Sequence, residues 1–186
     1  MDIDVPSAVV SGTMKINGAT VADTKDDGTL SLRTDAGDSV ALGITSAGQY
    51  SARAIPGTYD LYYRSYTAGT IAPRNLGAKL RSGAVVCAGT TTLNIDIPAS
   101  NITGLITVNN MVMSSTADYG ALELRANQDH AAELVDQVPL GLSYKGSYSV
   151  RVVPGNYDVY YRVRAVDPPS LAPHNILAKL RCLTVP

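Results

Sequence analysis

Short runs of alternating apolar and polar residues, separated by turn-forming residues, make up most of the chain. In residues 29–34, for example, Leu30 and Leu32 alternate with Ser31 and Arg33. Alternation with a period of two is typical of a strand with one buried face, and Gly, Pro, Asn and Asp between the runs mark turns. The first half predicts about seven strands, at Ala8–Ile16, Thr29–Thr34, Ser39–Thr45, Gln49–Ile55, Thr58–Tyr66, Leu76–Cys87 and Thr91–Ile97.

The second half of the chain repeats the pattern of the first. Gly12 matches Gly104 at a displacement of 92 positions, and Pro56–Arg64 returns as Pro154–Arg162 at a displacement of 98, after an insertion of six residues. Such self-similarity is the signature of a tandem duplication. The repeat predicts two domains, 1–98 and 99–186, each of a size typical of a small β-sandwich. The inserted region, residues 126–139, is predicted as an elaborated hairpin loop.

Composition supports an all-β protein and excludes several functions. Glu occurs twice and Lys five times among 186 residues, whereas Thr, Val and Tyr are plentiful; strands favour the second group and helices the first. A net charge of -1 argues against a nucleic-acid partner. No apolar run approaches the roughly 20 residues of a membrane span. The opening residues resemble no signal peptide, so we expect a cytosolic chain or a mature form that has lost its leader.

The repeated segment Pro-Gly-x-Tyr-Asp-x-Tyr-Tyr, preceded by Gly-x-Tyr, resembles the prealbumin-like β-sandwiches. This group includes the carboxypeptidase regulatory-like and Cna-B-like domains of bacterial surface proteins. The resemblance implies two tandem seven-stranded Ig-like, prealbumin-like β-sandwiches and an extracellular or cell-surface location, but no particular chemistry. The residues that carry it are Gly48, Tyr50, Pro56, Gly57, Tyr59 and Asp60, with Gly146, Tyr148, Pro154, Gly155, Tyr157 and Asp158 in the second copy.

The two copies end differently. The first continues after Ala78–Arg81 into a strand that ends at Leu93–Pro98, whereas the second has no counterpart of that strand in residues 182–186, after Ala178–Arg181. The chain instead opens on a close match to it, Met1–Pro6. The second domain is therefore expected to expose an unpaired edge. We expect the acceptor edge to be formed by Leu180, Cys182 and Thr184, and the donor strand by Met1, Asp2, Ile3, Asp4, Val5 and Pro6.

This arrangement suggests a structural subunit of an extracellular filament, tubule or pilus-like polymer. Met1–Pro6 of one copy would complete the second domain of the next by donor-strand complementation, so that the partner is the chain itself. The alternative is an adhesion module cut from a longer repeat protein. Such a module would bind a surface carbohydrate or protein through the 65–75 and 163–175 loops. Tyr62 and Tyr160 could serve it as a sugar-stacking platform, although tyrosines that fill the sandwich are the favoured interpretation.

No motif for catalysis or cofactor binding is present, and the chain is predicted not to be an enzyme. No metal or cofactor site is predicted. Acidic turns could hold Ca²⁺, but they lack EF-hand spacing and are predicted as solvated turns. A second acidic cluster, with His130, falls in the insertion. The acidic residues concerned are Asp23, Asp26, Asp27, Asp35 and Asp38 in the turns, and Asp129, Glu133 and Asp136 in the insertion.

The two cysteines, Cys87 and Cys182, occupy non-equivalent positions in the two copies. In an oxidising compartment they could bridge domains or subunits. Two buried free thiols are the alternative. An isopeptide between Lys15 and Asn94, of the kind found in many Cna-B-like domains, is disfavoured because Thr107 replaces the lysine in the second copy.

Overall fold

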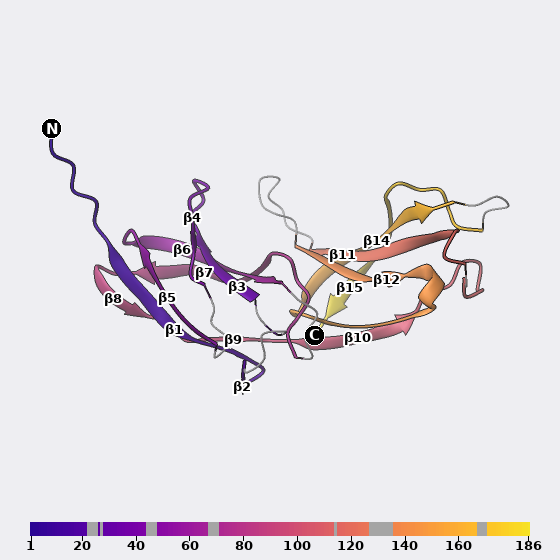
Figure 1. Cartoon of the computed structure of the whole chain (residues 1–186), viewed down its shortest axis with the longest axis horizontal. Coiled ribbons are helices and arrows are strands. Elements are labelled where there is room, and N and C mark those ends of the chain that lie inside the picture. Colours follow the sequence, from indigo (N-terminus) through magenta and orange to yellow (C-terminus); the bar gives the residue numbers. More distant parts are fainter. Residues whose placement is uncertain are drawn as a thin grey trace. The chain divides into compact units, whose positions relative to one another are not determined.

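The computed structural model describes the chain except residues 22–25, 27, 44–47, 67–70, 114, 127–135 and 167–170. The described residues form an all-β structure that divides into two compact units, Met1–Ala99 and Ser100–Pro186 (Figure 1). We call them the first and second units. The part of the chain that the structure describes contains no helix with the length and hydropathy needed to span a bilayer.

Two sheets build the first unit. One joins β1 to β2 and β5 by antiparallel pairing and to β8 and β9 by parallel pairing, and the other has the order β4-β3-β6-β7. The strands are β1 (Ala8–Ile16), β2 (Ala19–Thr20), β3 (Gly28–Arg33), β4 (Ser39–Ala41), β5 (Gln49–Ala54), β6 (Gly57–Ser65), β7 (Ala78–Val86), β8 (Gly89–Thr92) and β9 (Ile95–Ile97).

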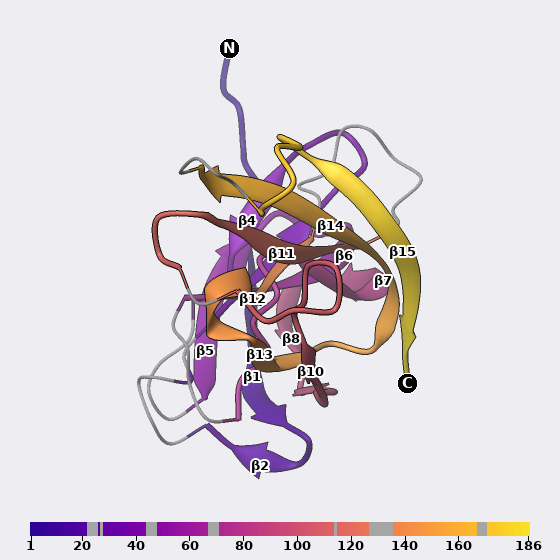
Figure 2. The same ribbon diagram turned by 90° about the vertical axis from the view of Figure 1, so that its right-hand side faces the viewer.

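Two sheets also build the second unit, with fewer strands. β10 pairs with β13, and a four-stranded sheet has the order β12-β11-β14-β15, which Figure 2 shows side by side. In this order, β12, β11, β14 and β15 correspond to β4, β3, β6 and β7 of the first unit. The elements are β10 (Ser100–Leu105), β11 (Tyr119–Ala126), β12 (Gln137–Leu142), the short 3-10 turn η2 (Ser143–Lys145), β13 (Ser147–Val152), β14 (Gly155–Ala165) and β15 (Ala178–Val185).

The strand count differs from the expected seven per domain. Among the described residues the first unit has nine strands and the second has six. The predicted strand Thr91–Ile97 is divided into β8 and β9, because the chain leaves the ladder between them. The residues predicted as a hairpin loop at 126–139 include the start of β12 at Gln137, whereas residues 127–135 lie outside the described part.

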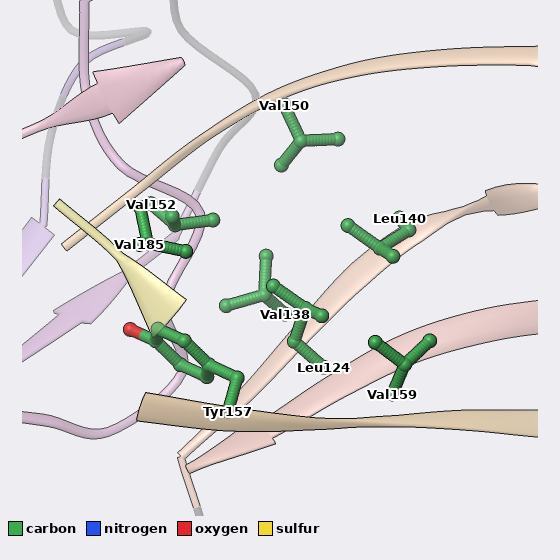
Figure 3. Packing of buried hydrophobic residues seen from close by; sticks show 8 residues of the cluster. All are labelled: Leu124, Val138, Leu140, Val150, Val152, Tyr157, Val159 and Val185. Atoms are coloured by element: carbon green, nitrogen blue, oxygen red, sulfur yellow. The ribbon is translucent and has the colours of Figure 1, made fainter. Parts of the chain in front are cut away.

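Apolar side chains from both sheets meet inside each unit. In the second unit, Val150 and Val152 of β13 face side chains of the four-stranded sheet, among them the Tyr157 ring (Figure 3). Burying each such side chain contributes about 1.5–3 kcal/mol. The full cluster consists of Leu124, Val138, Leu140, Val150, Val152, Tyr157, Val159 and Val185.

The repeated Pro-Gly-x-Tyr segment has a structural reason. The Tyr59 hydroxyl donates to the carbonyl of Ile55 at 2.6 Å, and the Tyr157 hydroxyl donates to the carbonyl of Val153 at 2.6 Å. Each tyrosine reaches back four residues, across the Pro-Gly turn, to the strand before it. The arrangement resembles the tyrosine corner of sandwich domains, and it fixes the crossing from one strand to the next.

A buried aspartate fastens one loop in each unit. The Asp26 carboxylate accepts the backbone N–H groups of Ile71 and Ala72, both at 2.9 Å. Asp118, which stands 92 positions later, accepts those of Leu171 at 2.6 Å and Ala172 at 3.2 Å. The prediction that Asp26 lies in a solvated turn is therefore wrong, because its side chain is buried and its Oδ1 accepts two loop amides.

Replacing Asp118 with Ala is expected to destabilise the second unit by about 2–3 kcal/mol, because one buried and one partly buried amide, of Ala172 and Leu171, lose an ionised acceptor. Urea unfolding followed by far-UV circular dichroism measures the effect. Asp118→Asn keeps one acceptor oxygen and is expected to lose less. Equal, small losses for both variants would contradict the assigned role of the carboxylate.

Candidate functional site

In the first unit, a strand fills the position beside β1. β8 pairs with β1 in parallel, with Ala8 opposite Gly89, and β9 continues with Met14 opposite Ile95 and Ile16 opposite Ile97. Ile95 and Ile97 are buried. The segment thus closes one side of the sandwich, and its apolar face completes the core.

Polar contacts hold this segment between β8 and β9. The Leu93 N–H donates to the carbonyl of Ser11 at 2.9 Å, and the Tyr50 hydroxyl donates to the Leu93 carbonyl. Burial raises the pKa of Tyr50 to about 12, so its hydroxyl keeps the proton that it donates. The Asn94 side-chain oxygen accepts the backbone N–H of Thr13 at 3.1 Å.

Gly12 makes this approach possible. A Cβ at Gly12 would overlap the Leu93 carbonyl, so any other residue would push the strand away from β1. Gly104 takes the matching place in β10, where a Cβ would instead meet the ring of Tyr148. The repeated glycine therefore marks the point where the backbone of the closing strand passes closest.

In the second unit, β10 is the counterpart of β1, and among the described residues it pairs only with β13. A groove of about 510 Å³ lies along this part of the unit. Its lining is largely apolar and comes from both sheets. Residues that line it include Leu105, Ile106, Leu140, Tyr148, Tyr161 and Leu180.

Several side chains at this groove lack the cover that their counterparts have. Asn75 is fully buried in the first unit, whereas Asn175 is exposed. The Tyr63 hydroxyl donates to the Pro73 carbonyl at 3.1 Å, but the hydroxyl of Tyr161, its counterpart, is buried without a hydrogen-bond partner. A buried donor without an acceptor is costly. The groove therefore exposes or leaves unpaired groups whose counterparts in the first unit are covered or hydrogen-bonded.

The segment Met1–Pro6 has the properties of a missing strand. It precedes β1 as an extended, fully exposed stretch (Figure 1), and Ile3 is 75% and Val5 64% exposed. These side chains match Ile95 and Ile97, which are buried where they close the first unit. Ile3 and Val5 stand at alternate positions, so both side chains could be buried on one side of a strand in an apolar groove.

The acceptor edge was predicted on β15, at Leu180, Cys182 and Thr184. Leu180 lines the groove and is 57% exposed. Thr184 donates its hydroxyl to Asn156 at 2.9 Å, and Cys182 is exposed. The hydrogen-bonding edge that corresponds to the filled position of the first unit is β10, which sequence reasoning did not name. The sequence indicates this edge, because Gly12 of β1 matches Gly104 of β10, and Tyr50 matches Tyr148.

The remaining candidate residues do not form a site. Cys87 and Cys182 are exposed free thiols in this chain, so the alternative of two buried thiols is wrong, and a bridge between subunits stays a prediction. Tyr62 is 1% exposed, with the Arg33 guanidinium 4.7 Å from its ring centroid, so it offers no sugar-stacking face. The Tyr160 ring has the Arg125 guanidinium at 5.0 Å.

The other polar candidates form no site within the part of the chain that the structure describes. Lys15 and Asn94 are exposed, unlike the buried groups that an isopeptide needs. Asp129, His130 and Glu133 lie outside the described residues, as do Asp23 and Asp27. Within the described ranges, no three His, Cys, Asp or Glu side chains are placed to share a metal ion.

An aspartate–lysine ion pair occurs at equivalent positions in the two units, with its aspartate on β6 in the first and on β14 in the second. Lys79 lies 2.5 Å from Asp60, and Lys179 lies 2.7 Å from Asp158. The hydrogen bond from Lys79 lowers the pKa of Asp60, with help from the Gly83 N–H and against the effect of burial. The hydrogen bond from Lys179 likewise lowers the pKa of Asp158.

These lowered pKa values lead us to expect a loss of stability in acid. Because each carboxyl has a lower pKa in the folded state, its contribution is complete above the unfolded pKa of about 3.9 and is lost as the pH falls through the folded value. The urea midpoint is expected to fall below about pH 4. Asp60→Asn should reduce the decrease of the urea midpoint at low pH. Asp35→Asn, at an exposed turn outside these pairs, should leave that decrease unchanged. The same acid dependence in both variants would contradict the expectation.

Comparisons with known proteins give structural similarity at low identity. No protein-family model matches the chain, and no curated protein matches it. A DUF3823 family protein from Parabacteroides merdae is 14% identical over 96% of this chain and 100% of its own, with a TM-score of 0.37. A protein from Bacteroides uniformis, provisionally described as carbohydrate binding, is 12% identical over 97% and 100%, also at 0.37. TM-scores this low do not establish a shared fold.

Proposed function

We propose that this chain is a non-catalytic binding module whose second unit takes up an extended strand along β10. The strand is Met1–Pro6 of another copy, which makes the chain a subunit that assembles head to tail. The observation that carries the proposal is the contrast between equivalent positions. Beside β1 a strand ending in Leu93–Pro98 completes the core, and beside β10 the matching position is an open groove.

The register of the added strand follows from the first unit. Ile95 and Ile97 lie opposite Met14 and Ile16 in parallel pairing. At the displacement of 92 positions, Ile3 then pairs with Ile106, and Val5 with Val108. Burying Ile3 and Val5 contributes about 1.5–3 kcal/mol each, before the cost of ordering the segment is subtracted. Main-chain hydrogen bonds to the end of β10 and to the residues that follow it, as far as Val108, add to this, as in other strand-addition complexes.

Such a contact joins two different surfaces of the same chain. Each copy offers a donor at its N-terminal segment and an acceptor in its second unit, so the contact is heterologous. Heterologous contacts extend into open filaments unless the rotation closes a ring. A structural filament, tubule or pilus-like polymer at the cell surface or outside the cell is the proposed setting. The surface-domain resemblance of the repeated tyrosine segment supports that location.

The proposal is tested by making the donor unfit for the groove. Light scattering after size exclusion and negative-stain microscopy are compared for the wild-type chain and for the double variant Ile3→Asp, Val5→Asp. Wild-type chains are expected to form polymers at high concentration, and the variant is expected to be monomeric with an unchanged circular dichroism spectrum. Asp2→Lys, which changes charge outside the apolar face, is the matched control. Polymers of unchanged length in the double variant would exclude this role for the segment.

A second candidate is binding of another protein or a glycan through the 65–75 and 163–175 loops. The described part of the second loop and the residues after it expose apolar side chains, with Leu171 at 57% and Ile176 at 81% exposure. Exposed apolar side chains of this kind favour a protein partner over a sugar. Residues 67–70 and 167–170 lie outside the described part. A glycan array with the wild-type chain tests the sugar ligand, and an array without hits would count against it.

A further inference from the structure

The turn that follows β10 has the same backbone shape whether or not a strand lies beside it. Asn109 and Asn110 have φ values of 50° and 63°, close to the 48° and 76° of Asn17 and Gly18 in the first unit. Val108 and Met111 close this turn with two backbone hydrogen bonds of 2.9 and 3.0 Å. Positive φ at both central residues is typical of a type I′ turn, which Asn tolerates. The turn is therefore already formed in the open groove.

In the first unit this turn holds the end of the closing strand. The Asn17 side chain donates to the Ala99 carbonyl at 2.7 Å and accepts the Ala99 N–H at 2.9 Å. The Asn17 N–H donates to the Ile97 carbonyl at 3.1 Å. The Gly18 N–H donates to the Asp96 carboxylate at 2.9 Å. Hydrogen bonds from both turn residues thus fix where the strand stops.

The corresponding groups of the second unit are free. Asn109 and Asn110 are exposed, and within the described chain neither the Asn109 side chain nor the Asn110 N–H makes a hydrogen bond. The donor segment supplies the matching partners, since Asp4 corresponds to Asp96, and Ser7 to Ala99. The positions match residue by residue at a single displacement, and no gap is needed.

We infer that the Asn109-Asn110 turn is a polar clamp that selects the incoming strand and fixes its register, an inference that rests on the proposed function. The Asn110 N–H donates to the Asp4 carboxylate, and the Asn109 side chain pairs with the backbone of Ser7. The groove therefore takes a particular class of ligand. This is an extended segment with an aspartate between two apolar residues, followed by Pro, as in Ile3-Asp4-Val5-Pro6 and in Ile95-Asp96-Ile97-Pro98.

The other end of the groove carries a second group for the same strand. Tyr148 corresponds to Tyr50, whose hydroxyl holds the Leu93 carbonyl. Tyr148 lines the groove, and among the described residues its hydroxyl makes no hydrogen bond. In the assigned register it meets the carbonyl of Met1. Preformed donors at both ends lower the ordering cost of a short strand, because only the ligand has to be fixed.

Peptide binding tests the clamp. A labelled peptide with the sequence of residues 1–9 is titrated by fluorescence anisotropy into the full chain carrying Ile3→Asp and Val5→Asp, which leaves the groove free. Replacing Asp4 of the peptide with Ala is expected to weaken binding about tenfold or more, because an ionised acceptor is lost. Replacing Asp4 with Asn retains an acceptor oxygen and should cost less.

The protein side of the clamp has a matched pair of variants. Asn109→Gly keeps the positive φ and removes the side chain that holds Ser7, and about a tenfold loss of peptide affinity is expected. Asn110→Gly keeps both the backbone N–H and the positive φ, so no loss is expected. Equal affinities for the wild-type and Asp4→Ala peptides, or equal losses in the two glycine variants, would overturn the clamp while leaving strand addition in place. The absence of binding by every peptide would instead contradict the proposed function.

Discussion

Closing the groove within one chain is expected to stabilise the second unit by about 3 kcal/mol and to stop assembly. The variant carries a copy of residues 88–98 directly after Pro186. In the first unit, Val86 at the end of β7 leads into β8 through Cys87 and Ala88, and Val185 takes the place of Val86 in the second unit. The added segment can therefore follow the same route into the groove.

The size of this effect comes from two isoleucines that pass from solvent into an incomplete core. Each contributes about 1.5–3 kcal/mol, against which the ordering of the added residues acts. Because the strand is tethered, its local concentration exceeds that of any donor from another copy. Urea unfolding measures the stability, and light scattering measures the assembly. The same extension with Asp in place of both isoleucines is the control; a rise in stability with both extensions would contradict burial in the groove.

Replacing Gly12 with Ala is expected to have the second large effect, a loss of about 3 kcal/mol from the first unit. The new Cβ would overlap the carbonyl of Leu93, which belongs to a backbone held on both sides by β1 contacts. The strand must then leave β1 along its middle, which uncovers Ile95 and Ile97. Thermal and urea unfolding would detect this loss.

The matched variant is Gly104→Ala in β10. There the added Cβ meets the Tyr148 ring, which is the far end of a side chain and can turn away. The loss of stability should be smaller, about 1 kcal/mol, while uptake of a strand along β10 should be lost because the Met1 backbone has no room. Equal destabilisation by the two alanines, or normal assembly of Gly104→Ala, would show that the glycine does not mark the path of a closing strand.

Much of the local structure follows from residue patterns. The alternation over residues 8–16 and 49–55 predicted β1 and β5 almost to the residue, because one face of each strand is buried and the other is not. The match between Met1–Pro6 and Leu93–Pro98 predicts an open strand position in the second unit, and the structure has a groove beside β10. These features are local or repeated, so the sequence contains them directly.

Other features depend on contacts that no local pattern contains. The acceptor edge predicted at Leu180, Cys182 and Thr184 lies on β15, whereas the filled position of the first unit lies beside β1, because parallel pairing joins segments about eighty residues apart. Asp26 is predicted to lie in a solvated turn, because it belongs to an acidic cluster without EF-hand spacing, but its partners are backbone amides 45 and 46 residues away. Tyr62 was considered for stacking because alternation placed it outside the core, whereas the Arg33 side chain covers it.

Disulfide trapping between copies tests whether Met1–Pro6 of one copy enters the second unit of another. In a background with Cys87→Ser and Cys182→Ser, one chain carries Val5→Cys and another Val108→Cys, and the two are mixed under mild oxidation. A covalent heterodimer is expected, because strand exchange places Val5 of one copy opposite Val108 of the next. Little product is expected with Thr20→Cys, an exposed position on the filled first unit. Equal trapping at both positions, or trapping at neither, would contradict strand exchange into the second unit.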